Sequence, residues 1–385
     1  NPLKLVAQLT AAGLPEQFVV AHADNELLIS MHVPASLELL IQEIRRHDRI
    51  RLVEFLYQHD QCPLTHNRDT YAHEVIIPFC TDGPQVLADL SQPPVQLPQR
   101  RFSVGSEWFY LKIYTGEKTS DALLIQAIYP AVQRLMQTEI IQAFYFIRYQ
   151  DTDSHLRLRF RGNPHVDFYQ YVVRAMQQAL AGAISSGVVH RVQVDTYQRE
   201  LERYGMEQIE QCETLFYYDS LSTLIFLTQT GSLFNEDTRF AVAAAKIDRL
   251  LRGLGLSTNQ YRRLMTNLKE QFFEEFGGES ALRHQLNDKY RLYQPVIRQA
   301  LTPDFMLNEG IWQWDRQQAG VLQQVATAIS EPNQLLNIAG SLIHMAVNRL
   351  FPSKQRVYEL VLYHCMAKYY DSVMARKAAG LPTLP

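Results

Sequence analysis

The chain has 385 residues, of which 46% are hydrophobic and 20% are charged, and its formal net charge is −3. These values are typical of a globular protein with room for two or three domains. A net charge this close to zero excludes a general attraction to nucleic acid, so any anion binding must be local.

Two further patterns exclude other classes of protein. The four cysteines are widely scattered and form no Cys-x-x-Cys pair, which favours reduced, mostly buried thiols in a cytosolic protein and argues against a metal site (Cys62, Cys80, Cys212 and Cys365). No run of 18 uncharged apolar residues is present, so no membrane-spanning helix is expected. The chain begins with Asn1 in place of Met, so we expect a piece of a longer polypeptide or a trimmed one.

Residues 1–90 are predicted to form a first domain. Its expected elements are strands over 18–22 and 26–31 joined by a turn at Asp24–Asn25, helices over 35–47 and 50–59, and a strand over 74–79. Three prolines within residues 93–98 favour an extended linker over 91–101. We therefore place a domain junction in that segment.

Residues 100–385 are predicted to form the main domain, of the α+β class. Strands and helices are mixed in its first half, with strands expected over 107–114, 143–149, 155–160 and 188–197 and helices over 120–138 and 166–180. The C-terminal half is expected to be mainly helical, with helices over 221–230, 258–276, 319–329, 333–350 and 357–376.

The stretch from Arg148 to Phe160 carries the strongest single pattern. Polar and apolar residues alternate from His155 onward, so a strand places His155, Arg157 and Arg159 on one face. Three cationic or protonatable groups in a row repel one another unless an anion or an acidic partner lies there. The pattern predicts a carboxylate or phosphate site on a rigid element, and an ion-paired edge strand is the alternative interpretation.

Two later segments also carry candidate chemistry. On a helix, Arg199 and Arg203 would lie one turn apart on one face, although a solvated helix surface with local ion pairs explains the same pattern. His344 and Asn348 would share a helix face, with Arg349 beside them. A histidine inside an apolar run is more often a core group, but His344 is also a candidate acid or base.

Taken in order, these segments resemble the C-terminal part of lantibiotic dehydratases, a domain that recurs in thiopeptide biosynthesis proteins. The resemblance covers residues 100–385 and rests on Glu107–Lys112, Phe146–Tyr149 with His155–Phe160, Glu202–Gly205, and His344–Met345 with Asn348–Leu350. Residues 1–90 are similar to the tail of the preceding glutamylation domain, through Asp24–Leu27 and Glu74–Pro78. Met206 departs from the family, which usually has a second glycine there.

The resemblance implies an activity. A full-length enzyme of this family takes glutamate from glutamyl-tRNA and esterifies Ser or Thr of a precursor peptide. The C-terminal domain then eliminates glutamate to leave dehydroalanine or dehydrobutyrine, and this half uses no metal, tRNA or other cofactor. A homodimer, an upstream glutamylation domain and a cyclase-type partner are implied as well. The alternative hypothesis is a non-catalytic module that binds the precursor or leader peptide.

The resemblance also assigns roles to residues. The eliminating arginines fall on Arg157 and Arg159, with a third on Arg203 or Arg199, and the family's histidine falls on His344. The departing glutamate carries a free carboxylate, which planar guanidinium groups bind in bidentate fashion. The remaining candidates for substrate binding are Arg148, His155, Tyr149, Lys112, Asn348 and Arg349, of which Lys112 and Tyr149 are also possible bases.

Overall fold

The computed structural model describes residues 2–22, 25–47, 50–55, 65–66, 69–70, 98–231, 235–302, 305 and 309–380. The predicted strand over 74–79, the motif Glu74–Pro78, Asp24 of the predicted turn, and Cys62 and Cys80 lie outside these residues. The chain divides into two compact units, 1–92 and 93–385. Each unit is described by itself.

The first unit is a small sheet with two helices. Its elements are α1 (Pro2–Ala11), β1 (Gln17–His22), β2 (Asn25–Ser30), α2 (Pro34–Arg46), β3 (Arg51–Glu54) and the short pair β4 (Thr65–His66) and β5 (Asp69–Thr70). The larger sheet is antiparallel in the order β2-β1-β3 and buries Phe18, Val20, Ile29 and Leu40. The helix predicted over 50–59 is wrong across β3, because Leu52 and Val53 pair with Val20 and Val19 of β1.

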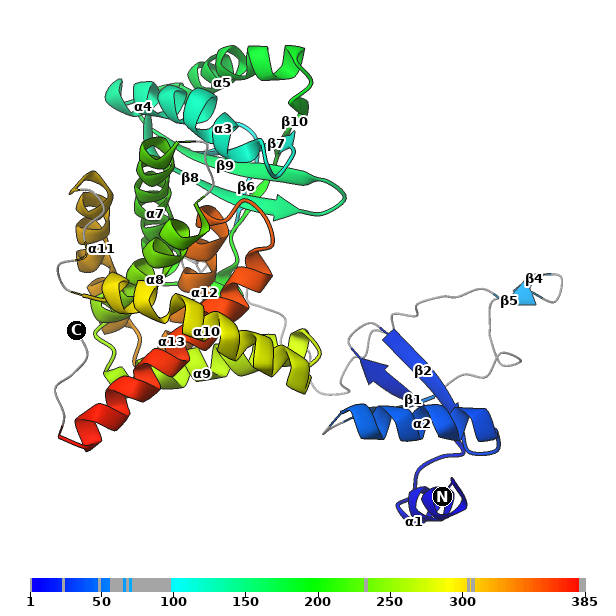
Figure 1. Cartoon of the computed structure of the whole chain (residues 1–385). Helices are drawn as coiled ribbons and strands as arrows, with labels where there is room; N and C mark the ends of the chain where they lie inside the picture. Colours follow the sequence, from blue (N-terminus) through cyan, green and yellow to red (C-terminus); the bar gives the residue numbers. More distant parts are fainter. Residues whose placement is uncertain are drawn as a thin grey trace, which may run out of the picture. The chain divides into compact units, whose positions relative to one another are not determined.

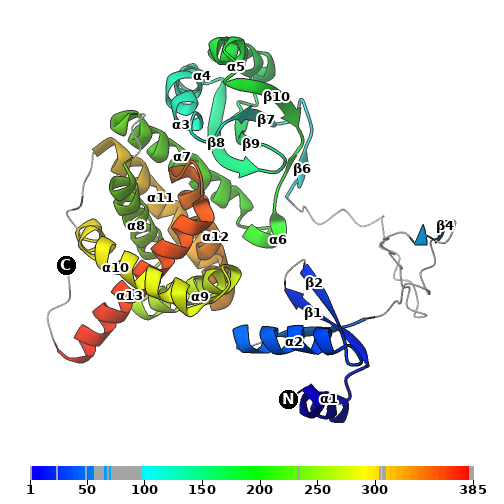
Figure 2. The same cartoon turned by 45° about the vertical axis from the view of Figure 1, so that its right-hand side comes forward.

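A four-stranded antiparallel sheet begins the second unit. Its strands are β7 (Trp108–Thr115), β8 (Ile141–Gln150), β9 (Ser154–Gly162) and β10 (Val189–Asp195), in the order β10-β7-β9-β8. The arginine-bearing strand β9 is therefore central, with β7 and β8 on its two sides, and the edge-strand interpretation is wrong. The segments α3 (Ser120–Leu123), η2 (Leu124–Ile128), α4 (Tyr129–Gln137) and α5 (Phe168–Ser185) lie on one side of this sheet (Figures 1 and 2).

Helices make up the rest of the second unit, which confirms the α+β prediction. After the pair β6 (Arg101–Phe102) and β11 (Tyr197–Gln198) come α6 (Leu201–Tyr204), α7 (Ile209–Thr230), α8 (Glu236–Gly253), α9 (Thr258–Glu275), α10 (Ser280–Ala300), α11 (Glu309–Ala328), α12 (Pro332–Leu350) and α13 (Gln355–Ala378). The sequence patterns missed α8 and α10. Sheet and helices share one hydrophobic core, and α12 and α6 lie on the side of the sheet away from α3–α5 (Figure 2).

Strand β8 lies at an edge of the sheet, and side chains from two helices bind its outer backbone groups. Asn348 of α12 accepts from the Arg148 amide and donates to the Arg148 carbonyl, both at 2.8 Å. Arg349 Nε donates to the Phe146 carbonyl, and the Phe146 amide donates to Ser220 Oγ of α7. These contacts fix α12 against the sheet and block pairing at this edge.

Replacing Asn348 with alanine should lower the free energy of unfolding by about 1–3 kcal/mol, because it leaves a peptide donor and a peptide acceptor of β8 without partners. Urea denaturation measures this loss. Asn163→Ala removes an amide on an exposed loop and serves as the control. Equal stability of the Asn348 variant and the wild type would contradict this role.

Candidate functional site

One face of the sheet brings together five of the predicted site residues, namely Lys112, Tyr149, His155, Arg157 and Arg159. Cross-strand pairs align Arg159 with Tyr110 and Tyr145, Arg157 with Lys112, and His155 with Tyr149. Leu156, Leu158 and Phe160 point into the core on the opposite face, as the alternation predicts. We call the polar surface the arginine face: Tyr110, Lys112, Tyr145, Tyr149, His155, Arg157 and Arg159.

Arg159 lies in a cage of three tyrosines. Its guanidinium carbon is 4.7 Å from the ring centroids of Tyr110 and Tyr197 and 5.2 Å from that of Tyr145, and the residue is only 9% exposed. Burial raises the pKa of Tyr145 to about 12, so this ring stays neutral near pH 7. Nε of Arg159 is buried and has no hydrogen-bond partner among the residues that the structure describes. A buried cation with an unused donor is suited to receive a carboxylate.

Arg157 is held by two neighbours on the same face. Its Nε donates to Nε2 of His155 at 3.2 Å, and its guanidinium carbon lies 3.4 Å from the ring centroid of Tyr149. Nδ1 of His155 lies 3.0 Å from the Asp153 carbonyl. Burial lowers the pKa of His155, and the nearby positive charge of Arg157 lowers it further. Neutral His155 therefore positions Arg157, which is a different role from the predicted substrate contact.

Lys112 extends the positive row toward β10. Its Nζ lies 2.5 Å from Asp195 Oδ2, and the hydrogen bond to this carboxylate raises the pKa of Lys112. A charged lysine in an ion pair is a poor proton acceptor, which argues against Lys112 as the base. Its charge is nonetheless available to attract an anion to the face.

His344 lies on α12 and is oriented by a buried carboxylate. Its Nδ1 is 2.7 Å from Oε1 of Glu359 on α13, and Tyr363 donates to the same oxygen at 2.8 Å. Glu359 is completely buried, whereas the His344 side chain is 24% exposed. A carboxylate on Nδ1 fixes the ring so that Nε2 is the nitrogen left for proton transfer.

Arg203 contacts the helix that carries His344. It lies on α6, is exposed, and its Nε donates to Oγ of Ser341, which is one helical turn before His344 on α12. Its Nη1 pairs with Glu200 at 3.3 Å, and the charge of Glu200 also acts on Arg159. The guanidinium of Arg203 is exposed and therefore accessible to a substrate.

Arg199 has a different environment from Arg203, so the prediction that both lie on one helix face is wrong. Arg199 precedes α6 and is 1% exposed. Its Nε and Nη2 donate to the two oxygens of Glu213 at 2.7 Å, and Tyr197 donates to Glu213 as well. Tyr197 is part of the Arg159 cage, so Arg199 supports that cage through Glu213. Arg203 is therefore the better candidate for the third arginine.

Three other predicted substrate residues belong to the packing between sheet and helices. Arg148 points away from the arginine face, is 5% exposed and donates to Asp121 at 2.5 Å and to Ser120 at 2.6 Å. Arg349 is 1% exposed and pairs with Asp219 at 2.9 Å. Asn348 binds the backbone of β8. Their contacts give them structural roles, because alternating residues of β8 face opposite sides and α12 packs on its edge.

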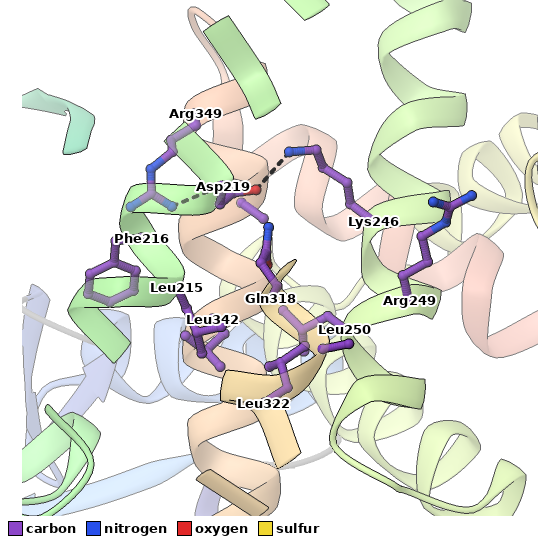
Figure 3. A pocket seen from close by; sticks show the side chains of 12 residues that line it. Leu215, Phe216, Asp219, Lys246, Arg249, Leu250, Gln318, Leu322, Leu342 and Arg349 are labelled. Atoms are coloured by element: carbon purple, nitrogen blue, oxygen red, sulfur yellow. Dashed lines mark hydrogen bonds and ion pairs between the residues drawn. The ribbon is translucent and has the colours of Figure 1, made fainter. Parts of the chain in front are cut away.

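A cavity in the helical bundle lies apart from the arginine face (Figure 3). It has a volume of about 40 Å³ and is lined by residues of α7, α8, α11 and α12. The figure shows Asp219 bridging Lys246 and Arg349, at 2.8 and 2.9 Å. A closed ion cluster with all three side chains paired is typical of bundle packing, so this cavity is not our candidate site.

Acidification should destabilise the protein because two histidines are buried in the neutral form. Burial lowers the pKa of His155, and burial with nearby lysines lowers that of His364 to about 4. Their stabilisation is complete above the unfolded pKa of about 6.5 and is lost as pH falls toward 4. Urea denaturation at pH 7.5 and 5 should show a loss of about 2 kcal/mol from His364. The His364→Gln variant should show a smaller loss, and an equal loss in both would contradict the assignment.

The comparisons with known proteins identify the domain. The family model described as the C-terminal part of lantibiotic biosynthesis dehydratases matches residues 108–370. The chain belongs to this family. The subtilin biosynthesis protein SpaB of Bacillus subtilis is 22% identical over 93% of the chain, and the chain spans only 35% of that protein.

Solved structures show that the fold is shared more widely. The tRNA-dependent lantibiotic dehydratase MibB from Microbispora sp. 107891 matches with a TM-score of 0.55 and 18% identity, over 97% of this chain and 38% of its own. The pyridine synthase TbtD from thiomuracin biosynthesis matches with a TM-score of 0.53 and 12% identity, over 70% of this chain and 99% of its own. Similarities this low show the fold alone.

The sequence patterns missed several groups in this dehydratase domain. Glu359 binds His344 and accepts a hydrogen bond from Tyr363, and Tyr110, Tyr145 and Tyr197 surround Arg159. A signal for Glu359 was available, because it is a single acidic residue within the apolar stretch from Val357 to Met366 of α13. The tyrosine cage becomes visible only when the strand order and register are known.

The cysteines, the possible metal ligands and the hydropathy of the helices can also be compared with the predictions. Cys212 and Cys365 are buried free thiols, as predicted, and burial raises the pKa of each to about 12. Within the described ranges, no group of three or more His, Cys, Asp or Glu residues is placed to hold a metal ion. Among the same residues, no helix is long and apolar enough to cross a membrane. The absence of a cofactor and the cytosolic location stay predictions.

Proposed function

We propose that the second unit is a lyase that eliminates glutamate from glutamylated Ser or Thr residues of a ribosomally made precursor peptide. The products are dehydroalanine and dehydrobutyrine. One observation carries the proposal: a buried arginine, whose Nε has no hydrogen-bond partner among the described residues, lies on the same side of the sheet as α6 and α12. The exposed Arg203 of α6 contacts Ser341 of α12, one turn before the carboxylate-oriented His344. Family membership supports it, whereas the fold alone does not select a reaction.

The first role in this mechanism is binding of the leaving group. The glutamyl group keeps a free carboxylate, and Arg159, Arg157 and Lys112 offer positive charge on one rigid sheet face. The tyrosine cage keeps the side chain of Arg159 ordered before the substrate arrives, which reduces the entropic cost of binding. The free carboxylate binds at this face, with the ester directed toward α12.

Elimination then needs one proton transfer and no redox change. Nε2 of His344 removes the α-proton of the modified residue, and that electron pair forms the Cα–Cβ double bond. The Cβ–O bond breaks, and its electrons leave with glutamate as a carboxylate, which is a good leaving group because an α-carboxyl has a pKa near 3.5. Arg203 stabilises the negative charge that develops on the substrate.

Incubation of the chain with a synthetic glutamyl-Ser peptide tests the proposal. Mass spectrometry should show a dehydro residue and free glutamic acid without tRNA or ATP. Unmodified peptide would indicate hydrolysis, and an unchanged glutamyl peptide would support the alternative of a peptide-binding module. Adding an upstream glutamylation domain separates a binding module from a lyase that needs this domain to present the substrate. A homodimer and a cyclase-type partner remain proposals from the family.

Replacing Arg203 with alanine should slow elimination by about 10- to 100-fold, because a hydrogen bond to a charged group contributes about 1.5–3 kcal/mol. The free energy of unfolding should change by no more than about 0.5 kcal/mol, since the side chain is exposed. Rates of dehydro-product formation and urea curves measure the two effects. A normal rate would exclude Arg203 as the third arginine.

A further inference from the structure

A second polar cavity lies between α9, α10 and α13. It has a volume of about 130 Å³, several times the roughly 30 Å³ that one water molecule occupies in the liquid. None of the residues that line it belongs to the arginine face or contacts His344. We call it the His364 cavity: Lys269, Glu270, Phe273, Arg283, Leu286, Asn287, His364 and Lys368.

The polar groups of the His364 cavity are mostly donors. Lys269 from α9, Arg283 from α10 and Lys368 from α13 bring three positive charges, against one negative charge from Glu270. Lys269 pairs with Glu270 at 2.7 Å, so its charge is partly balanced. The guanidinium of Arg283 lies 5.0 Å from the ring centroid of Phe273, which holds it at the cavity wall.

The His364 cavity is also lined by a buried histidine, one ring nitrogen of which has no hydrogen-bond partner among the described residues. His364 is 5% exposed, and its Nε2 makes no hydrogen bond within the described residues. Burial and the positive charges of Lys269 and Lys368 lower its pKa to about 4, so the ring is neutral near pH 7. A neutral imidazole can place its one proton on Nε2 and donate it. A buried polar atom without a partner, in a residue that lines a cavity, calls for a ligand or an ordered water.

We propose that the His364 cavity binds a small oxyanion, with a carboxylate or a phosphate as the group recognised. The three positive side chains outweigh the single negative one, so the cavity attracts an anion. The Asn287 amide and His364 Nε2 supply directed hydrogen-bond donors. Phe273 and Leu286 form a buried apolar part of the wall, whereas Arg283 and Lys368 are exposed at the opening, where an anion can enter. This site is independent of the proposed elimination reaction.

Thermal unfolding of the full chain tests the proposal with inorganic phosphate and L-glutamate as probes, at a constant ionic strength set with chloride. Either probe should raise Tm saturably, by about 2–5 °C at a tenfold excess over its Kd. The Lys269→Met/Lys368→Met variant should lose the saturable rise, and Lys377→Met, an exposed lysine further along α13, should keep it. His364→Gln should bind more weakly.

The pattern of responses also identifies the anion. Only a rise that the double variant loses is assigned to this cavity, since glutamate can also bind the arginine face. Such a rise with phosphate alone identifies a phosphate site, one with glutamate alone identifies a carboxylate site, and one with both identifies an oxyanion site without selectivity. A wild-type Tm that does not respond would mean that water fills the cavity, which overturns the proposal. An equal response in wild type and the double variant would overturn it too, because binding would then lie elsewhere.

Discussion

Replacing Arg159 with lysine should lower the rate of glutamate elimination about 100- to 1,000-fold while the protein stays folded. Lysine keeps the positive charge but loses the planar fork that can bind a carboxylate through two parallel hydrogen bonds. The tyrosine rings around Arg159 also stack on a flat guanidinium better than on an ammonium group. The expected loss is in both KM and kcat, because the anion is bound before and during bond breaking.

Arg161→Lys is the matched control for this variant. Arg161 lies two residues further along β9 on the same face, is half-buried, and pairs across the sheet with Trp108 and Ala143 instead of tyrosines. Its replacement should leave the rate within about threefold of the wild type, which corresponds to about 0.6 kcal/mol. If the two variants lose the same activity, the guanidinium groups of β9 contribute equally whatever their position, and the tyrosine cage has no special role.

Removing the His344 imidazole should slow elimination by about 100- to 10,000-fold, which is the usual range for a positioned general base. His344→Ala should reduce kcat more than it changes KM, because the imidazole takes part in the proton-transfer step. Glu359→Gln should have a smaller effect, about 10- to 100-fold, because the amide can keep the contact to Nδ1 but carries no charge. Quenched time courses with the glutamyl peptide measure these rates.

The two variants together test whether His344 and Glu359 act as a unit. The double variant should be no slower than His344→Ala alone, because Glu359 acts only through the ring. The pH dependence of kcat should also move in Glu359→Gln, whereas a residue needed only for folding would leave this profile unchanged. Multiplicative losses in the double variant would show that Glu359 has a separate function.

The sequence predicted which residues share the arginine face better than it predicted the strands and side chains around them. Alternation from His155 to Phe160 was enough to place Arg157 and Arg159 together, because side chains of a strand alternate strictly between two faces. It did not reveal that β9 is central or that tyrosines from β7 and β8 surround Arg159. β8 is joined to β9 by a short turn, but the central position of β9 depends on its pairing with β7, which α3, η2, α4 and β8 separate from it in the chain. Period-two patterns do not encode such pairing.

Arginines outside the strand show the limit of such reasoning more clearly. Arg148, Arg199 and Arg349 share the residue type of the site, but each is buried with a carboxylate from another element, namely Asp121, Glu213 and Asp219. Sequence patterns show that an arginine is present, but they do not show whether a carboxylate from another element already binds its guanidinium. His344 was found through its motif, yet its partner Glu359 lies on the next helix, which the pattern did not connect to it.

The most direct test of one shared site is a structure of the chain with a peptide in which glutamate is attached through an amide instead of an ester, so that elimination is slow. We predict that the free carboxylate of the glutamyl group binds Arg159 and Arg157, with the α-carbon of the modified residue near Nε2 of His344 and Arg203 beside its carbonyl. A glutamyl group bound away from the arginine face, or an α-carbon out of reach of His344, would contradict the proposed mechanism.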